Sequence, residues 1–195
     1  MLKELEAPFR SNEEIKYLEI ISKGAEEMGR LIDALLSFSK LQRTDLRKSI
    51  INTTELVNSV IGYMNEDIKE RNIEFRIGNI PDCMGDEQLI KLVWINLISN
   101  AIKYTSKNSK AEIEIGSIDN ENENVFFIRD NGVGFDMQYA GKLFGVFQRL
   151  HHQRDFEGIG IGLANVNSII LRHGGTCSAE GEVDRGAAFY FSLPK

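Results

Sequence analysis

Apolar residues recur at intervals of three and four over the first part of the chain. Their positions are Leu18, Ile21, Ala25, Met28, Ile32 and Leu35. This heptad-type seam, widened by Leu31 and Phe38, predicts a long helix with a broad apolar face. Ser11 and Glu14 form a capping-box pattern at its start. A face of this width must be buried against other helices.

Residues 1–9 are interpreted as the tail of a preceding helix that ends near Pro8. Residues 1–45 would then form the C-terminal part of a helical hairpin, and two such hairpins would close a four-helix bundle. We therefore expect a homodimer through the N-terminal helices. The alternative is that the long helix packs on the domain that follows.

The periodicity stops after Leu41, and the polar segment from Gln42 to Arg47 is predicted to be the hinge to a second domain, residues 46–195. Its expected elements are strands at 48–51, 73–77, 111–118, 125–129, 176–182 and 187–193, and helices at 52–68, 86–104 and 161–172. They lack the strict alternation of a parallel sheet. The expected fold class is therefore α+β: a two-layer α/β sandwich with a mixed sheet and helices on one face.

Composition narrows the partners. The chain of 195 residues has a net charge of −6, so it lacks the basic footprint of a nucleic-acid binder, and no nucleic-acid partner is expected. No apolar run is long enough to span a membrane. We expect a cytoplasmic fragment without direct membrane contact, although a longer parent protein could be anchored elsewhere. Cys83 and Cys177 have no metal-type spacing and are interpreted as reduced packing residues.

One predicted helix carries polar residues on an otherwise apolar surface. Asn96, Asn100 and Lys103 follow one another at i, i+4 and i+7, which places them on one stripe. Buried amides need polar partners, because an unpaired polar group in the interior is costly. From this helix alone, a solvent-exposed stripe is an equally good interpretation.

Two glycine-rich segments change that balance. Asp130 ends a predicted strand and is followed by Gly132 and Gly134, which permit close backbone approach. Residues 131–162, called the lid below, contain seven glycines, and a loop of this length in a compact domain is usually functional, as a lid or a binding loop. The second segment, residues 157–164, has glycine at every second position before a helix. The N–H groups at such a helix start can bind phosphate.

Together these segments resemble the N, G1, F and G2 boxes of the GHKL, or Bergerat-type, ATP-binding superfamily. That superfamily includes histidine kinases, type II topoisomerases, mismatch-repair ATPases and heat-shock ATPase chaperones. The resemblance covers roughly residues 46–195. Residues 143–151 match the F box, and residues 186–194 match the usual end of the kinase domain. In sequence, the F box and the segment Arg172-His173-Gly174-Gly175 are most similar to phytochrome-related histidine kinases.

The resemblance implies a role for each matched residue and implies ATP and Mg²⁺ as cofactors. Asp130 would accept a hydrogen bond from the adenine amino group, and Asn100 would supply an oxygen to Mg²⁺. Asn96 and Lys103 would hold the phosphates and serve as the catalytic residues. Tyr104 would pack on the adenine ring, and Gly134 would let the base lie close. The N–H groups of Gly160 and Gly162 would face the phosphates, and Lys142 or Arg149 would add positive charge. The remaining residues assigned to ATP are Gly132, Phe147, Gly158 and Leu163.

The sequence departs from the family pattern at two kinds of position. The family usually has threonine where Ile159 stands, so a hydroxyl group near the phosphates is lost, which affects the geometry of the lid. The histidines at 151, 152 and 173 match no phosphoacceptor motif and are interpreted as surface or packing residues. The segment from Lys3 to Phe9 is similar to the family's H-E-L-R-x-P-L acceptor motif, with lysine in place of histidine.

The expected activity follows from Asn96. Hydrolysing members of the superfamily carry glutamate at this position as a general base, whereas an imidazole nitrogen has its own lone pair and needs less help. We expect transfer to a histidine upstream of residue 1, for relay to a response-regulator receiver domain. The fragment alone would not autophosphorylate. A stand-alone ATPase and a signalling scaffold that only binds nucleotide are the alternatives.

Overall fold

A computed structural model describes the chain except for residues 1–11, 44, 65–67, 70, 151–154 and 157. The helices are α1 (Asn12–Arg43), α2 (Thr53–Met64), α3 (Glu87–Tyr104), the 3₁₀ helix η1 (Met137–Lys142) and α4 (Gly162–His173). The strands are β1 (Ser49–Ile51), β2 (Ile73–Ile77), β3 (Cys83–Gly85), β4 (Ala111–Asp119), β5 (Glu123–Asp130), β6 (Cys177–Glu182) and β7 (Gly186–Pro194). The expected tail of a preceding helix and the Ser11 cap lie outside the described residues.

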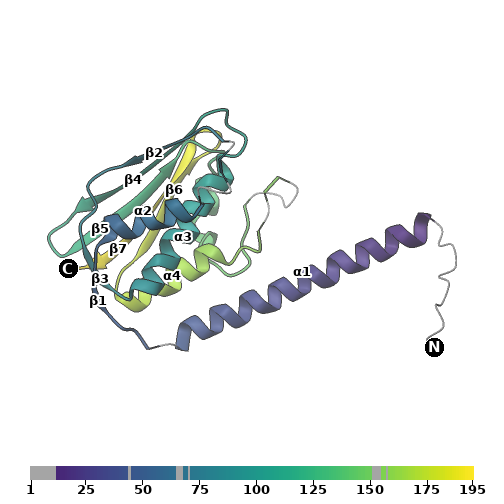
Figure 1. The fold of residues 1–195 in the computed structure, drawn as a ribbon, viewed down its shortest axis with the longest axis horizontal. Helices are drawn as coiled ribbons and strands as arrows, with labels where there is room; N and C mark the ends of the chain where they lie inside the picture. Colours follow the sequence, from purple (N-terminus) through teal and green to yellow (C-terminus); the bar gives the residue numbers. More distant parts are fainter. Residues whose placement is uncertain (1–11, 44, 65–67, 70, 151–154, 157) are drawn as a thin grey trace.

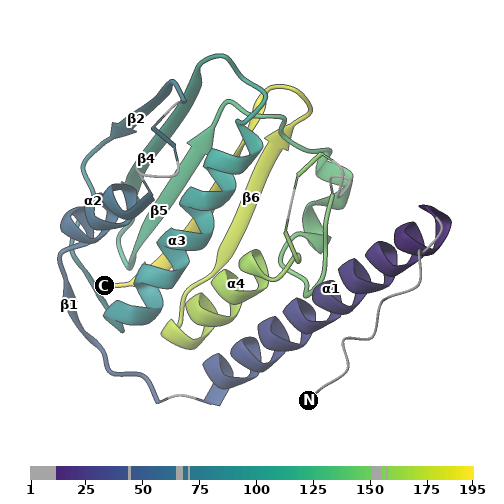
Figure 2. The same ribbon diagram turned by 45° about the vertical axis from the view of Figure 1, so that its right-hand side comes forward.

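The large sheet is mixed, as expected. Its strands run in the order β2-β4-β5-β7-β6, with β2 and β4 parallel and the other neighbours antiparallel. Figures 1 and 2 show α2, α3 and α4 over the same face of this sheet. On β4, Ala111, Ile113 and Ile115 are buried, whereas Glu112 and Glu114 between them point to the other face. The sheet therefore has one packed and one solvated face.

Local signals explain where the helices begin and end. Asp86 caps α3, because its Oδ1 accepts a hydrogen bond from the Leu89 N–H at 3.2 Å. Asn52 caps α2 in the same way through the Glu55 N–H at 3.1 Å. Helix α4 ends at Gly174, whose φ of 89° gives the left-handed conformation of a C-terminal stop. Ile68, expected on the second helix, lies beyond the end of α2.

The core lies between the helices and the sheet. Trp94 of α3 is fully buried and meets Phe126 of β5 and Phe191 of β7 edge to face, with ring centroids 6.2 and 5.1 Å apart. Such aromatic contacts add to the free energy gained by area burial. Helix α3 is therefore fixed against the middle of the sheet, and its opposite side is left to line a cavity.

Helix α1 continues away from this domain. Its C-terminal part lies beside α4, and its N-terminal part projects past the rest of the molecule (Figures 1 and 2). The seam residues Ile21, Met28 and Ile32 are 66%, 60% and 58% exposed. Packing on the following domain therefore does not cover the seam. None of the helices in the described part of the chain combines the length and apolar character that crossing a membrane requires.

Candidate nucleotide-binding site

Two adjoining cavities lie between α3, α4 and the long loop that joins β5 to α4. The larger has a volume of about 650 Å³ and the smaller about 50 Å³. Tyr104, Leu143, Gln148, Arg149 and Leu163 line both of them. The site is therefore one elongated hollow with a wide polar part and a narrow apolar part.

The polar stripe of α3 faces the larger cavity. Asn96, Asn100 and Lys103 all line it, and each is half-buried. The stripe is therefore neither buried in the core nor fully exposed, because its side chains line a hollow that is partly open to solvent. Burial lowers the pKa of the Lys103 amine, and the nearby Arg149 guanidinium lowers it further. A bound anion would offset both effects.

Asn96 is held between its own helix and the start of α4. Its Nδ2 donates to the Leu92 carbonyl at 2.7 Å, and its Oδ1 would lie 2.7 Å from a Cβ added to Gly162. Glycine at 162 therefore allows α4 to approach the asparagine closely. In this orientation the amide oxygen faces Gly162. A phosphate contact through the Asn96 nitrogen would require the amide to turn over.

The carboxyl group of Asp130 lies at the narrow end of the hollow. The side chain is buried at the end of β5, and its Oδ1 accepts a hydrogen bond from the Gly132 N–H at 2.8 Å. Burial raises the pKa of this carboxyl to about 6, although hydrogen bonds from the Gly132 and Ala187 N–H groups act in the opposite direction. A buried acceptor beside apolar walls suits a flat base with an amino group.

The structure gives a second reason, which the sequence did not predict, for a glycine at position 134. Its φ is +57°, and a Cβ added to it would lie 1.9 Å from the Glu182 carbonyl oxygen. The residue also lines the narrow cavity. Glycine is therefore required here by the backbone of the β6–β7 turn, in addition to any role in letting a base lie close.

The glycine-rich segment before α4 closes the wide part. Gly158, Gly160 and Gly162 line the larger cavity, and the first two have positive φ. The N-cap residue of α4 is Ile161, which has no side-chain oxygen to accept from the first N–H groups. These donors and the positive end of the helix dipole are therefore available to an anion.

Most of the predicted site residues line one cavity or both, but three do not. Gly132 lies behind Asp130, and a Cβ on it would lie 2.5 Å from the Tyr104 carbonyl oxygen. Lys142 lies at the end of η1, with its Nζ 5.9 Å from the Tyr139 ring centroid. Phe147 is 44% exposed and has a φ of 60°. Of the two lid cations, Arg149 lines both cavities, and its Nη2 donates to the Phe156 carbonyl at 2.6 Å.

The cavity also has lining residues that the sequence analysis missed. They are Arg30, Ala34 and Ser37 of α1, Leu143, Gln148 and Phe156 of the lid, and Ile161 and Asn165 at the start of α4. Phe156 meets the Tyr104 ring edge to face at 5.0 Å. The α1 residues were missed because their helix was assigned to a separate domain. Only the folded chain brings that helix to the cavity.

Asn100 fits the role of a metal ligand. Its amide lines the cavity and makes no hydrogen bond with the described part of the chain, so its oxygen is available to a hard cation. Within the described residues, no three histidine, cysteine or acidic side chains are grouped as a metal site. A magnesium ion would therefore depend on Asn100 together with phosphate oxygens and water.

The other residues singled out in the sequence have structural roles where they are described. His173 is buried: its Nε2 accepts from the Asp86 N–H at 3.0 Å, and its Nδ1 lies 2.7 Å from the Ile169 carbonyl oxygen. It is a packing residue, as expected. The histidines at 151 and 152 lie outside the described residues. Cys83 and Cys177 are both free, and burial raises the pKa of the Cys177 thiol to about 12.

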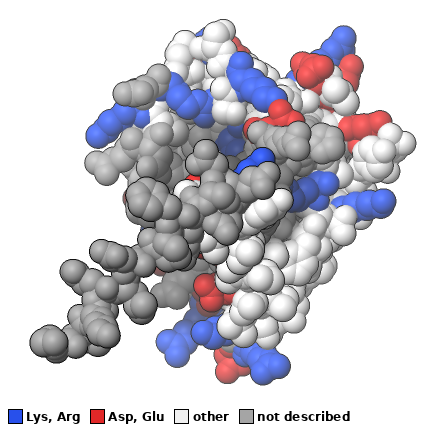
Figure 3. Space-filling model, turned by 90° about the vertical axis from the view of Figure 1, so that its right-hand side faces the viewer, with Lys and Arg blue, Asp and Glu red and all other residues white. Residues whose placement is uncertain are grey.

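Charges on the neighbouring surface are mixed in sign. Figure 3 shows lysine and arginine side chains interspersed with aspartate and glutamate on the face toward the N-terminal end of α1. The charged side chains drawn in colour on this face therefore form no large patch of a single sign.

Comparison with known proteins identifies the family of this arrangement. Residues 85–195 match the family described as histidine kinase-, DNA gyrase B-, and HSP90-like ATPase. The phytochrome-like protein Cph1 of Synechocystis sp. is 32% identical over 178 residues, which are 91% of this chain and 24% of that protein. Cyanobacterial phytochrome B of Nostoc sp. is 38% identical over 171 residues, 86% of this chain and 23% of that protein.

Solved structures of histidine kinases share the fold. The catalytic domain of the histidine kinase ThkA has a TM-score of 0.65 and 28% identity, and the match covers 76% of this chain and 98% of that domain. ThkA solved in complex with the response regulator protein TrrA has a TM-score of 0.69 and 26% identity, with 99% of this chain and 54% of that chain covered.

The chain spans about a quarter of the length of the curated relatives given above. The family match begins at the end of β3 and contains all the residues that line the narrow cavity and all those of the wide cavity except the three from α1. The chain therefore belongs to the histidine kinase-, DNA gyrase B-, and HSP90-like ATPase family.

Proposed function

We propose that this chain is the ATP-binding catalytic core of a two-component sensor histidine kinase. Residues 46–195 would be the ATP-binding domain, and residues 1–45 would be part of the dimerisation hairpin. The observation that carries the proposal is Asn96, an amide that lines the large cavity at the position where hydrolysing relatives have a glutamate base. The phosphoryl group would go to a histidine, and from there to a response-regulator aspartate.

The cavities suggest how a nucleotide would lie. Asp130 would accept a hydrogen bond from the adenine amino group in the narrow part. Lys103, Arg149 and the N–H groups before α4 would bind the phosphates in the wide part. Magnesium held at Asn100 would neutralise charge that develops on the phosphate oxygens. The nucleotide would thus be oriented along the whole hollow.

The transfer step needs no general base from this chain. A lone pair on the acceptor imidazole would form the N–P bond to the γ-phosphorus. The bond from that phosphorus to the β–γ bridging oxygen would break, and ADP would leave. Lys103, Arg149 and the N–H groups before α4 would hold the phosphates in line for the attack, which is the main contribution expected in phosphoryl transfer.

The names of the relatives support a signalling role. The methanogenesis regulatory histidine kinase FilI of Methanothrix harundinacea is 33% identical over 178 residues. The sensor histidine kinase WalK of Bacillus subtilis is 30% identical over 189 residues. The ThkA complex contains a response regulator, and we propose a partner of the same kind for this chain. The exposed seam of α1 supports a homodimer.

The proposal is tested by following the γ-phosphate. A version of the protein extended upstream to include an acceptor histidine is incubated with γ-labelled Mg-ATP. We expect acid-labile, base-stable label on the protein, and no label when Asp130 is changed to alanine. Release of the label only as free phosphate, at appreciable turnover, would contradict the proposal and favour a stand-alone ATPase. ATP binding without transfer to any histidine would favour a scaffold.

A further inference from the structure

The helix assigned to dimerisation also forms part of the nucleotide cavity. Arg30, Ala34 and Ser37 line the larger cavity, and their spacing of i, i+4 and i+7 places them on one stripe of α1. At about 100° per residue, this stripe lies roughly opposite the apolar seam. Dimerisation through the seam would therefore leave the stripe facing the cavity.

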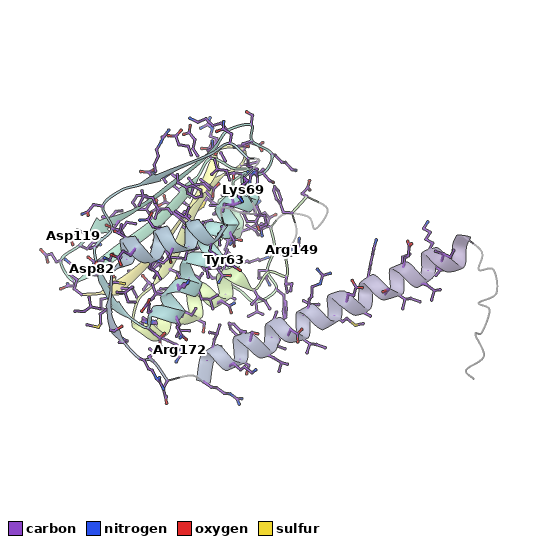
Figure 4. All side chains as sticks on the ribbon, in the orientation of Figure 1. Tyr63, Lys69, Asp82, Asp119, Arg149 and Arg172 are labelled. Carbon is purple, nitrogen blue, oxygen red and sulfur yellow. The ribbon has the colours of Figure 1, made fainter. Side chains whose placement is uncertain are left out.

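The C-terminal part of α1 is attached to the catalytic domain at a defined point. The Arg172 guanidinium of α4 donates to the Leu41 carbonyl, one of the last carbonyls of α1. Leu41 also packs against the hydrophobic core. Figure 4 shows Arg172 near the C-terminal end of α1, and Arg149 on the loop between β5 and α4. The contact places Arg30 about three helical turns before the attachment.

The lining of the larger cavity is strongly one-sided in charge. Its described residues include three cations, Arg30, Lys103 and Arg149, and no carboxylate. This is notable in a chain whose net charge is −6. A guanidinium is suited to phosphate, because its planar N–H groups can bind two oxygens together. The cavity is therefore built for a polyanion, and α1 supplies one of its charges.

The position of α1 along the hollow determines which phosphate group of a bound nucleotide Arg30 would contact. The narrow cavity, which contains Asp130, has no lining residue from α1 among the described residues. Helix α1 lines only the wide cavity. If the adenine amino group binds at Asp130, the phosphates extend away from it, and the terminal phosphate is the group that lies farthest from Asp130.

We propose that Arg30 is a positioning residue that binds the terminal phosphate of ATP from α1, so that ATP holds the helix against the catalytic domain more firmly than ADP does. This inference rests on the proposed function, since it assumes ATP in the cavity. The two binding events are linked, so a nucleotide that gains affinity from Arg30 must stabilise the docked helix by the same factor. The identity of the nucleotide would thereby be reported to the dimerisation helix.

The test compares two nucleotides that differ by the terminal phosphate. The affinities of Mg-AMPPNP and Mg-ADP are measured by titration calorimetry for the wild-type chain and Arg30→Ala. We expect AMPPNP to bind about tenfold more weakly to the variant, as for loss of a charge-assisted hydrogen bond, and ADP to change by less than about twofold. Arg30→Lys should recover part of the lost AMPPNP affinity, because lysine keeps the positive charge but lacks the planar pair of N–H donors of the guanidinium.

Lys23→Ala is the matched control, because Lys23 lies seven residues earlier on the same face of α1 and does not line the cavity. It should leave both affinities unchanged. Hydrogen exchange gives a second measurement: AMPPNP should protect residues 30–41 more than ADP does, and the difference should vanish in Arg30→Ala.

Three results would overturn the inference, each in a recognisable way. Equal losses for AMPPNP and ADP would show that Arg30 does not distinguish the terminal phosphate. Unchanged affinities would show that Arg30 does not contact the bound nucleotide. In both cases wild-type binding would leave the proposed function intact. Failure of the wild-type chain to bind either nucleotide would instead overturn the proposed function together with the inference.

Discussion

Among the individual residues, Asp130 has a buried carboxyl group that lines the narrow cavity. Its pKa is raised from 3.8 to about 6, with burial as the largest cause. As a carboxylate it can accept a hydrogen bond from an adenine amino group, whereas protonation removes much of that capacity. We therefore predict that ATP affinity falls about tenfold between about pH 7 and pH 5, because the ionised fraction of a carboxyl group with a pKa of about 6 falls about tenfold over that range. Calorimetric titration at both values checks this.

The sign of the stability effect is opposite to that of an ordinary paired carboxylate. Between about pH 4 and pH 6 the folded, nucleotide-free protein holds a proton on Asp130 that the unfolded chain has lost. The contribution of this group to the free energy of unfolding therefore falls as the pH rises through that window. Asp130→Asn is the control, because it should bind ATP weakly at both pH values and show no such slope. A wild-type affinity that does not change with pH would contradict the assignment of Asp130 to the base.

Whether a site residue can be predicted from the sequence depends on how far it lies along the chain from the other residues of the site. Asn96, Asn100 and Lys103 share one helix face, so their spacing placed them on one stripe, and the two glycine-rich segments then favoured a common site over an exposed stripe. Arg30 comes to the same cavity from a helix more than sixty residues earlier in the chain. Nothing in its local pattern distinguishes it from other charged residues of α1. Its role depends on tertiary packing.

The same contrast holds for whole elements. The starts of helices α2 and α3 were predicted closely because Asn52 and Asp86 cap them, and capping is a local signal, whereas α2 ends at Met64, before the predicted end at residue 68. Strand β3 was missed, because three residues give too short an alternation to recognise. It pairs with β1, with Ile51 opposite Cys83. The pairing of distant strands is specified by the packed fold and not by either segment alone.

Helices α3 and α4 are joined by one histidine. His173, near the end of α4, accepts the Asp86 N–H just before α3, while its other nitrogen lies at the Ile169 carbonyl. Both contacts are made by a neutral imidazole, and burial lowers the pKa of His173 below its ordinary value of 6.5. The stability that it contributes is therefore complete above about pH 6.5 and is lost as the pH falls toward the lowered pKa.

We predict that His173→Gln lowers the free energy of unfolding by about 1–2 kcal/mol at neutral pH, because the Asp86 N–H loses its partner. The variant should also lose less stability than the wild type between about pH 7 and pH 5.5, since the group that titrates is gone. Urea denaturation at the two pH values measures both effects. Asp130 acts with the opposite sign in part of this range, so the comparison is between variant and wild type at each pH. A steeper pH dependence in the variant would contradict the prediction.

At the scale of the whole molecule, α1 has two faces with different neighbours. One face carries Arg30 toward the nucleotide cavity, and the other carries the exposed apolar seam. A seam of this length exposed on a free monomer would be unusual, because contiguous apolar surface mostly marks an interface. The domain on one side and a second copy on the other would together bury most of the helix.

We therefore predict that Ile21→Lys with Met28→Lys converts a dimer into a monomer, since each charge would have to be buried in the bundle. Sedimentation equilibrium measures the change in mass. Ile50→Lys is the control: Ile50 is 73% exposed on β1, away from the seam, and should leave the dimer intact. ADP affinity should be unchanged in every variant, because the seam lies opposite the stripe that lines the cavity. A wild-type chain that sediments as a monomer, or a seam variant that stays dimeric, would show that these residues do not form the interface. If the seam variant stays dimeric, the second copy must contact another surface; in either case the exposed seam would need a different partner.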